Sequence, residues 1–500
     1  MGRTKGCCPV LDCFNYLGAD GPCNLKITIN LLEMKTIEQH LVEFISNPSA
    51  YKVLVVGCGI SGFAALQFLK QKGVEVSLSD SGLKKDASPT LLEWLESENV
   101  FSEFGGHQSK TFLNADLLVV SPGVPLNIPQ ITECYRQGIP IVGEMGLASC
   151  FINIPVVAVT GTNGKTTVTE MLGTMFRAGG QKVFVGGNIG TPLTEFLIGS
   201  QDAELAVLEV SSFQLETAGI LQPKVGVMLN ITPDHLDRYE SFEAYGDTKF
   251  QLFANQHQSD VMVLNCDDRE IMERVNKKTL QGEKYFFGNT LSGLPGAEWK
   301  NNCVELCWAG KGKKKEQYPL SAQMKLSPVR ENCMAAILAA RLMGCSEEGI
   351  RRGLEKFQTL PHRVSLIAEI NNVSYYDDSK ATNIGAVQSA LVGMNQPVIL
   401  IAGGRDKGGD YSLLSEAVRK KVKRLLLIGE AKEKMERVLG KVVQVEMPQG
   451  LEAAVRRAAE LADPGDAVLL SPACASFDMF QSYVDRGNHF QKAVRLLLEN

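Results

Sequence analysis

The sequence contains no long apolar run and no tail of a single charge. No stretch reaches the ~18 apolar residues that a membrane-spanning helix requires, so we expect no membrane insertion. The 51 basic and 56 acidic side chains almost cancel and leave a formal net charge of −5. Because no acidic or basic tail points to nucleic acid, we expect no nucleic-acid partner. Any anionic ligand must be held by local charges.

Histidine is scarce, with six residues, whereas cysteine is frequent, with 13. The cysteines do not indicate a disulfide framework, because a chain of 500 residues can bury large cores without cross-links. The N-terminal cluster of Cys7, Cys8, Cys13 and Cys23 fits none of the usual spacings of a zinc site. We therefore expect reduced cysteines that behave as small apolar side chains.

The first 33 residues differ in composition from the rest of the chain. They lack the apolar core of a signal peptide, and Met34 opens the first amphipathic stretch, MKTIEQHLVEFI. We expect Met34 to be the true start of the protein. Residues 1–33 would then be a wrongly assigned or dispensable extension.

The most informative segment is a glycine-rich turn between a predicted strand and a predicted helix. Residues 154–159 form an apolar, β-branched run, and a helical period follows Lys165. Such a turn directs backbone N–H groups at a phosphate, and a lysine and a threonine hydroxyl add a charge and a Mg²⁺ ligand. The loop is shorter than the usual phosphate loop, because Val159 stands where its first glycine is expected. We predict nucleoside triphosphate binding by Gly161, Thr162, Asn163, Gly164, Lys165, Thr166 and Thr167.

A second glycine motif, GCGISG at residues 57–62, follows the apolar run KVLVV and opens a helix predicted over 61–72. Asp80 ends the next predicted strand. This pattern is typical of a dinucleotide site of the Rossmann type, but the diphosphate of a UDP-sugar would fit it equally well. Ser121, after the strand DLLVV, could add further donors from a neighbouring loop.

Several polar residues lie where predicted strands of the middle third end. Glu209 follows LAVL and is well placed to bind Mg²⁺ beside the phosphate loop. Asn188, Ser211 and Gln214 occupy similar strand ends and could contact the substrate. His235 lies between two aspartates after another strand, which favours either a metal ligand or a helix start.

Strand and helix patterns alternate along the whole chain without a repeat or a long linker. The predicted fold is therefore α/β with three domains in series. They are a Rossmann-like domain over residues 34–150, a central domain over 151–358 with the parallel sheet of a P-loop ATPase, and a Rossmann-like domain over 359–500. A basic, glycine-rich stretch at 310–315 is predicted as an exposed hairpin, and the alanine-rich stretch 332–343 as a helix.

Together the motifs resemble those of the Mur ligase family over residues from about 50 to 500. The matching segments are GTNGKTT, GGNIG, LEVSSFQLE, NITPDHLDRY, PHR, DDSKATN, AGGRDKGGDYS and SPACASFDMF with RGNHF, in the family's order. The resemblance implies an ATP-dependent ligase of peptidoglycan precursor synthesis in the cytoplasm. The last two segments favour the branch that adds D-glutamate to UDP-N-acetylmuramoyl-L-alanine through an acyl phosphate. These two small molecules are the expected partners, and we expect a monomer.

The resemblance also assigns roles to individual residues. Two Mg²⁺ ions are expected on Thr166, Glu209, His235 and Lys249, with Lys249 modified to a carbamate by CO₂. With Lys165, the last three form the expected catalytic set. Nucleotide contacts are expected from Asn332, Arg363 and Asp378. The resemblance places the UDP-linked substrate on Ile60, Ser61, Asp80 and Ser121, and we add Asn188, Ser211 and Gln214 from their positions at strand ends. The D-glutamate pocket is expected at Lys380, Thr382, Lys407, Ser476 and Tyr483.

Two positions depart from the family pattern, and four alternatives remain, of which the first is another Mur ligase. Pro328 and Val329 stand where we place the family's His-Asn pair, so adenine recognition must differ, and Tyr483 replaces a common phenylalanine. A folylpolyglutamate synthase-like ligase would share the central domain but would lack the GCGISG domain. An NAD(P)-dependent oxidoreductase rests on GCGISG alone, and a nucleotide-binding scaffold would bind ATP without chemistry.

Overall fold

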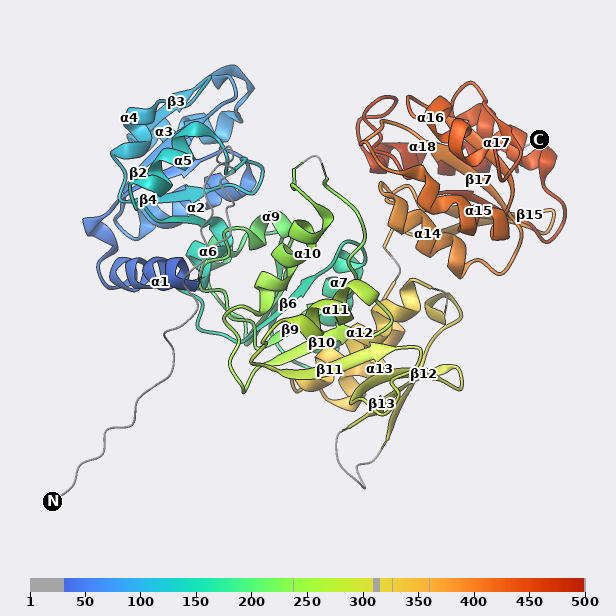
Figure 1. The fold of residues 1–500 in the computed structure, drawn as a ribbon, viewed down its shortest axis with the longest axis horizontal. Helices are drawn as coiled ribbons and strands as arrows, with labels where there is room; N and C mark the ends of the chain where they lie inside the picture. Colours follow the sequence, from blue (N-terminus) through green and yellow to red (C-terminus); the bar gives the residue numbers. More distant parts are fainter. Residues whose placement is uncertain (1–30, 237, 309–314, 326, 359, 499–500) are drawn as a thin grey trace, which may run out of the picture.

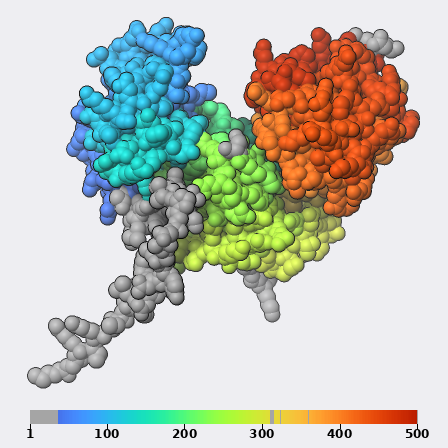
Figure 2. All heavy atoms as spheres, turned by 45° about the horizontal axis from the view of Figure 1, so that its top comes forward, coloured from blue at the N-terminus to red at the C-terminus, as the bar shows by residue number. Residues whose placement is uncertain are grey.

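The structure is a computed structural model that describes residues 31–236, 238–308, 315–325, 327–358 and 360–498. Three β-sheets follow one another along the chain, each covered by helices (Figure 1). The N-terminal and C-terminal units stand on opposite sides of the central unit (Figure 2). The expected α/β class with three domains in series is confirmed. The domain boundaries stay a prediction.

The N-terminal unit is a five-stranded parallel sheet in the order β3-β2-β1-β4-β5. Its central strands β1 and β4 are almost wholly apolar, as expected for strands that are covered on both faces. The elements are α1 (Leu31–Ser46), η1 (Pro48–Ala50), β1 (Lys52–Val56), α2 (Ile60–Gln71), β2 (Glu75–Asp80), η2 (Lys84–Asp86), α3 (Pro89–Ser97), β3 (Phe101–Phe104), α4 (Ser109–Leu113), β4 (Leu117–Val120), α5 (Pro129–Arg136), β5 (Ile141–Gly143) and α6 (Glu144–Ser149).

The central unit is a nine-stranded sheet in the order β14-β13-β12-β11-β10-β9-β6-β8-β7. Strands β6 to β12 pair in parallel, whereas β13 and β14 add two antiparallel strands at one edge of the sheet. The elements are β6 (Val156–Thr160), α7 (Lys165–Ala178), β7 (Val183–Gly187), α8 (Leu193–Ile198), β8 (Leu205–Glu209), α9 (Ser212–Leu215), β9 (Val225–Met228), α10 (Phe242–Phe250), η3 (Gln251–Phe253), β10 (Val261–Asn265), α11 (Arg269–Lys277), β11 (Glu283–Gly288), β12 (Gly296–Lys300), β13 (Cys303–Cys307), β14 (Glu316–Pro319), η4 (Gln323–Lys325), α12 (Val329–Leu342) and α13 (Glu347–Lys356).

The C-terminal unit is a six-stranded sheet in the order β15-β16-β20-β17-β18-β19, parallel except for the edge strand β15. The elements are β15 (Ser365–Ile370), β16 (Val373–Asp377), α14 (Ile384–Gly393), β17 (Val398–Gly403), η5 (Tyr411–Leu414), α15 (Ser415–Lys421), β18 (Val422–Ile428), α16 (Lys432–Leu439), β19 (Val445–Glu446), α17 (Leu451–Leu461), β20 (Ala467–Leu470) and α18 (Tyr483–Leu496).

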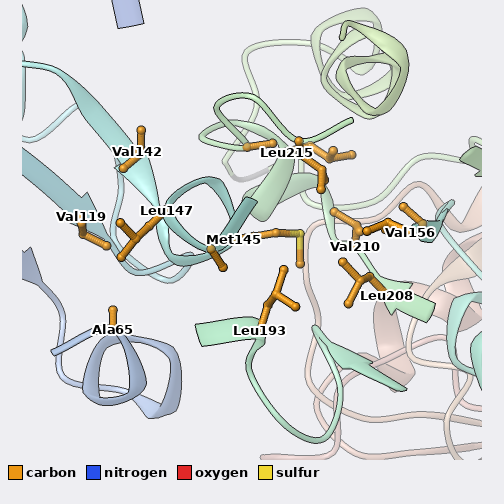
Figure 3. Close-up of a cluster of buried hydrophobic side chains, with 14 of the residues drawn as sticks. Ala65, Val119, Val142, Met145, Leu147, Val156, Leu193, Leu208, Val210 and Leu215 are labelled. Carbon is orange, nitrogen blue, oxygen red and sulfur yellow. The ribbon is translucent and has the colours of Figure 1, made fainter. Parts of the chain in front are cut away.

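One apolar core joins the first two units. Met145, in α6, lies between the N-terminal sheet and Leu193 and Leu208 of the central unit (Figure 3). Val119 and Val142 of the N-terminal sheet belong to the same cluster. The C-terminal sheet instead has apolar clusters of its own on its two faces. Burial of shared apolar surface therefore fixes the first unit on the second.

The structure corrects several predicted boundaries. Helix α2 starts at Ile60 rather than 61, and α12 starts at Val329, three residues before the predicted 332. The first helix begins at Leu31, before Met34, whereas residues 1–30 of the expected extension lie outside the described residues. Residues 310–314 of the predicted hairpin also lie outside them, between the antiparallel strands β13 and β14. Among the described helices, none is both long and apolar enough to cross a bilayer.

Candidate active site

The phosphate loop lies in the middle of the central sheet. Its strand, β6, is paired between β9 and β8, and its helix, α7, begins at Lys165. Gly164 has a positive φ of 88°, and a Cβ at this position would collide with the Asn332 side chain. Only glycine meets both conditions without strain. The turn therefore brings the N-terminus of α7 to the carboxyl edge of the sheet, where ligands bind in α/β folds.

Side chains that follow the neighbouring strand β9 hold this loop in shape. The Asn163 N–H donates to Asn230 Oδ1 at 2.8 Å, and Asn230 Nδ2 donates to the Asn163 carbonyl at 3.0 Å. The Thr162 hydroxyl donates to the Thr232 carbonyl and accepts from the Thr232 N–H. Tyr245, in α10, lies 3.1 Å from the same hydroxyl. The loop is therefore preorganised by residues distant in sequence, a role that we did not predict for Asn230 or Tyr245.

The Lys165 ammonium group is folded back on its own loop. Its Nζ donates to the carbonyls of Gly161 at 3.0 Å and Thr162 at 2.9 Å. Burial lowers the pKa of Lys165, and the charge of Arg363 adds to this, whereas Glu209 and Asp234 oppose it. A half-buried cation with carboxylates nearby is thus placed at the start of α7.

Glu209, at the end of β8, offers an unused acceptor beside the phosphate loop. Its Oε1 accepts from Asn188 Nδ2 at 2.8 Å, whereas Oε2 is buried and has no hydrogen-bond partner. The residue is 2% exposed. A buried carboxylate oxygen without a partner is costly, and a bound cation would remove that cost. The residues present therefore fit a Mg²⁺ ion.

His235 lies in the loop after β9 with a positive φ of 55°. Its ring centroid is 4.7 Å from that of Phe213 and 6.3 Å from that of Tyr245. The adjacent Asp234 carboxylate accepts a hydrogen bond from Asn383, in the C-terminal unit, at 2.9 Å. His235 thus contacts Tyr245, whose hydroxyl reaches the phosphate loop, and its neighbour Asp234 contacts the C-terminal unit.

Lys249, in α10, is buried directly beneath the phosphate loop. It is 1% exposed, its Nζ donates to the Gly161 carbonyl at 3.0 Å, and it lies 4.6 Å from the Tyr245 ring centroid. Burial, and then the charge of Lys165, lower the pKa of Lys249 well below its ordinary value. A lysine in this environment is easily converted to its neutral, nucleophilic form.

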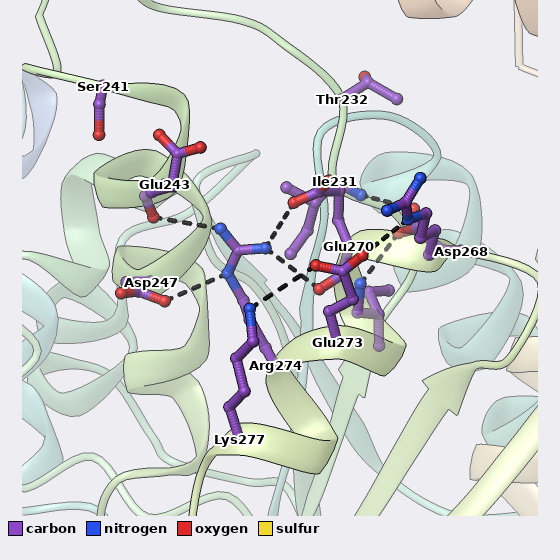
Figure 4. A network of polar contacts seen from close by, with 12 residues as sticks. Ile231, Thr232, Ser241, Glu243, Asp247, Asp268, Glu270, Glu273, Arg274 and Lys277 are labelled. Carbon is purple, nitrogen blue, oxygen red and sulfur yellow. Dashed lines mark hydrogen bonds and ion pairs between the residues drawn. The ribbon is translucent and has the colours of Figure 1, made fainter.

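A polar network fixes the helix that carries Lys249. Arg274, in α11, donates to Asp247 at 3.1 Å and to the Glu243 carbonyl at 3.3 Å, both in α10 (Figure 4). It also pairs with Glu270 of its own helix at 2.7 Å. Asp268, which caps α11, accepts from the Ile231 N–H. These contacts tie α10 and α11 to the loop that contains His235.

The cleft between the central and C-terminal units contains the predicted nucleotide residues Asn332, Arg363 and Asp378. It runs from the phosphate loop to Pro328 and Val329 on one side and α14 on the other. Burial raises the pKa of Asp378 to about 7, although the Ser471 hydroxyl, at 2.8 Å, and the charge of Arg363 counteract it. The structure therefore brings these three residues together.

Two lysines and an aromatic ring gather at the edge of the C-terminal sheet that faces the phosphate loop. Lys380 Nζ lies 3.8 Å from the Tyr483 ring centroid. Burial, together with the charges of Arg363, Lys165 and Lys407, lowers the pKa of Lys380 to about 8, although Glu209 opposes this shift. Such a group of cations is suited to a dicarboxylate.

Backbone contacts connect the rest of the predicted amino-acid pocket. The Thr382 N–H donates to the Lys380 carbonyl at 2.8 Å, and Ser476 is 2% exposed. Arg486, in α18, is fully buried and donates to Ser379 and to the carbonyls of Cys474 and Ala475. It thus joins the segments of Lys380 and Ser476. The arginine belongs to the motif RGNHF, for which the sequence alone indicated no role.

In the N-terminal unit, the GCGISG turn is held by the groups predicted to bind a ligand. Asp80 accepts from the N–H groups of Cys58 at 2.7 Å and Gly82 at 2.6 Å, and these bonds lower its pKa although burial opposes them. The Ser121 hydroxyl donates to the Gly57 carbonyl at 3.0 Å. Both side chains therefore shape the turn, whereas Ile60, 75% exposed, opens onto solvent at the start of α2.

The other predicted substrate contacts lie on the central sheet. Ser211 and Gln214 form a capping box at the start of α9, and Asn188 follows β7. These positions are at the same edge as Glu209. Ser61, in α2, lies on the N-terminal unit with Ile60. The predicted residues therefore form a central group around the phosphate loop and a separate N-terminal group.

Three family models match the chain in order. They are the Mur ligase MurD-like N-terminal domain over residues 51–143, the Mur ligase middle domain over 159–340 and the Mur ligase glutamate ligase domain over 362–474. Each covers one of the three sheets.

Relatives and solved structures agree with these matches. The UDP-N-acetylmuramoylalanine–D-glutamate ligase of Desulfosudis oleivorans is 44% identical over 90% of this chain and 97% of its own length. A pseudomurein peptide ligase type C from Methanothermus fervidus has a TM-score of 0.56 at 19% identity, over 89% of this chain and 100% of its own. The MurF ligase of Thermotoga maritima in complex with ADP has a TM-score of 0.55 at 17% identity, over 89% and 95%. The chain belongs to the Mur ligase family.

Proposed function

We propose that this protein is the ATP-dependent ligase that joins D-glutamate to UDP-N-acetylmuramoyl-L-alanine in peptidoglycan precursor synthesis. One observation carries the proposal. The preorganised phosphate loop and a cluster of cations from the C-terminal unit line the same cleft. The relative from Desulfosudis oleivorans, which carries this activity in its name, aligns over nearly its whole length. The MurD-like domain over residues 51–143 argues against a folylpolyglutamate synthase-like ligase.

The reaction begins with attack of the alanyl carboxylate on the γ-phosphate of ATP. A P–O bond to the carboxylate forms and the bond to ADP breaks, so the carboxylate becomes an acyl phosphate. Lys165 and the N-terminus of α7 stabilise the charge that builds up on the transferred group. The D-glutamate amine then attacks the acyl carbon, loses a proton and expels inorganic phosphate. Positioning and electrostatics suffice, without a protein nucleophile.

Two Mg²⁺ ions would be held by Thr166, Glu209, His235 and a carbamylated Lys249. They would neutralise charge on the phosphates. Two features support this assignment: the unpartnered Glu209 oxygen, and the burial of Lys249 that favours its neutral amine. Addition of CO₂ to that amine would convert a cation into an anion beside the phosphate loop.

The remaining roles follow the position of each residue. Asn332, Arg363 and Asp378 would hold the nucleotide in the cleft that they line. The D-glutamate carboxylates would bind Lys380, Lys407, Thr382 and Ser476, with Tyr483 covering Lys380. Ile60, Ser61, Asp80 and Ser121 would hold the uridine diphosphate, and Asn188, Ser211 and Gln214 the muramoyl end. We place the reaction in the cytoplasm and the protein in a monomeric state.

Phosphate release tests the proposal. The purified protein is given ATP, Mg²⁺ and UDP-N-acetylmuramoyl-L-alanine together with D-glutamate, L-glutamate, L-alanine or a diamino acid in turn. We expect release with D-glutamate at least about tenfold faster than with the other amino acids. Equal release with every amino acid, or oxidation of NAD(P)H under the same conditions, would refute the assignment.

A further inference from the structure

Arg238 lies where three segments of the molecule meet. It belongs to the loop after β9 that also contains His235. Its Nη1 donates to the Pro122 carbonyl at 3.1 Å and its Nη2 to the Val124 carbonyl at 3.4 Å, both in the N-terminal unit. Nη2 also pairs with Glu216, which follows α9, at 2.6 Å. One guanidinium group therefore connects the N-terminal loop, α9 and the His235 loop.

These contacts lie in a largely buried environment. The side chains of Arg238 and Glu216 are 19% and 15% exposed. The Arg238 guanidinium carbon lies 4.2 Å from the Phe213 ring centroid, in the range of a cation–π contact. A planar guanidinium group that lies over an aromatic ring holds its N–H donors in a fixed orientation. A lysine in its place would not reproduce that orientation.

Each connected segment carries residues of the proposed substrate site. The loop that Arg238 holds starts at Ser121, whose hydroxyl bonds to Gly57 of the GCGISG turn. Phe213 lies in α9 between Ser211 and Gln214, and its ring also packs against His235 at 4.7 Å. The contacts of Arg238 therefore connect the loop that starts at Ser121, proposed to hold the uridine diphosphate, with the loop that contains His235, a proposed metal ligand.

We infer that Arg238 is a positioning residue for the UDP-linked substrate. It holds the Ser121–Val124 loop on the central unit, so that a substrate anchored on the N-terminal unit presents its carboxylate at the phosphate loop. The inference rests on the proposed function, because it assigns the substrate of that reaction to this loop. The two units are already joined by the shared core around Met145, so Arg238 is needed for the alignment of the loop rather than for their association.

The test compares Arg238→Ala and Arg238→Lys with Arg269→Ala, a control at an arginine whose side chain is 88% exposed. Steady-state phosphate release gives kcat and the KM of each substrate. For Arg238→Ala we expect the KM of UDP-N-acetylmuramoyl-L-alanine to rise about tenfold and kcat to fall about 10- to 100-fold, since a misplacement of ~1 Å has effects of this size. The KM of ATP should stay within about twofold. Arg238→Lys should recover part of the loss, and the control should match the wild type.

Calorimetric binding of UDP-N-acetylmuramoyl-L-alanine, without ATP or D-glutamate, separates this inference from the proposed function. An inactive wild type would refute the function, whereas the binding comparison would still test Arg238. We expect Arg238→Ala to bind this substrate about tenfold more weakly than the control, while its unfolding temperature, lowered by the loss of the ion pair with Glu216, stays above the assay temperature. Equal affinity in the two variants, or an equal loss for all three substrates together with an unfolding temperature below that of the assay, would overturn the inference.

Discussion

At the scale of single residues, three lysines around the phosphate loop share one property. Burial lowers the pKa of Lys165, Lys249 and Lys380, and their mutual repulsion lowers the pKa values of Lys249 and Lys380 further. Cations that are crowded in this way gain much from an anion between them. A triphosphate and a dicarboxylate are such anions.

Lys165→Ala should abolish ATP turnover and leave the fold intact. In the proposed reaction the ammonium group stabilises charge on the transferred phosphoryl group, and the loss of such a group lowers kcat by about 10³-fold or more. Alanine is a good helix former, so α7 should still begin at residue 165. Phosphate release measures ATP turnover, and circular dichroism checks that the fold is intact. Ligase activity close to that of the wild type would contradict the role of Lys165.

Lys380 predicts how dicarboxylate binding depends on pH. Its pKa of about 8 means that the charged form, which attracts the carboxylates, is present below this pH and is lost as the pH rises through it. Glutarate has the two carboxylates of D-glutamate but no amine that titrates. We expect its inhibition constant to rise about tenfold between about pH 7 and about pH 9. The variant Lys380→Arg, which stays charged, should remove most of this rise; a flat profile in the wild type would contradict the prediction.

The sequence alone could place candidate residues at the carboxyl ends of strands where they stand in a continuous motif, as Gly161–Thr167 and Glu209 do. It did not predict contacts such as that of Arg238 with Pro122 or of Asn230 with Asn163. These partners are separated by tens of residues, and only the folded arrangement of strands and units brings them together.

At the scale of elements, local patterns predicted the buried parallel strands but not the edges of the sheets. The apolar runs of β1, β6 and β17 are recognisable because both faces of each strand are covered. Strands β12 and β14 contain GAEWK and EQYP, which have no such pattern. Their strand conformation comes from pairing with a neighbour.

The start of α14 offers a test at this scale. Asn383 caps this helix by accepting from the Ala386 N–H at 2.9 Å, and its amide also donates to Asn163 at 3.1 Å and Asp234 at 2.9 Å. Both variants lose the hydrogen bonds to Asn163 and Asp234, but Asn383→Ala should lower the free energy of unfolding by about 1 kcal/mol more than Asn383→Ser, which keeps a cap. Urea denaturation measures both.

The same pair of variants separates the cap from the contact between units. Both lose the amide donors to Asn163 and Asp234, so both should raise the KM of ATP about threefold or more. If Asn383→Ser lowered the free energy of unfolding as much as Asn383→Ala, the assignment of the cap would be wrong. If the KM of ATP were unchanged in both variants, the contacts of Asn383 with Asn163 and Asp234 would have no role in ATP binding.

At the scale of the whole molecule, the three units are joined in different ways. The first two share an apolar core, whereas the C-terminal unit has clusters of its own and meets the phosphate loop through polar contacts such as that of Asn383 with Asn163. Polar contacts of this kind can be exchanged at low cost, so the C-terminal unit is the one expected to move.

Small-angle X-ray scattering should detect that motion. With a non-hydrolysable ATP analogue, Mg²⁺ and UDP-N-acetylmuramoyl-L-alanine, we expect the radius of gyration to fall as the C-terminal unit closes on the nucleotide. The uridine substrate alone should have little effect, because its proposed site lies on the two units that already share a core. A radius of gyration that is the same in all states would contradict this account of the motion.

The central claim is that the phosphate loop activates a carboxylate of the substrate by phosphorylation. The direct measurement uses UDP-N-acetylmuramoyl-L-alanine with ¹⁸O in its alanyl carboxylate, and mass spectrometry of the phosphate released during ligation to D-glutamate. An acyl phosphate requires one labelled oxygen to leave with each phosphate. The account predicts labelled phosphate in the same amount as the amide product, and amide product formed with unlabelled phosphate would contradict it.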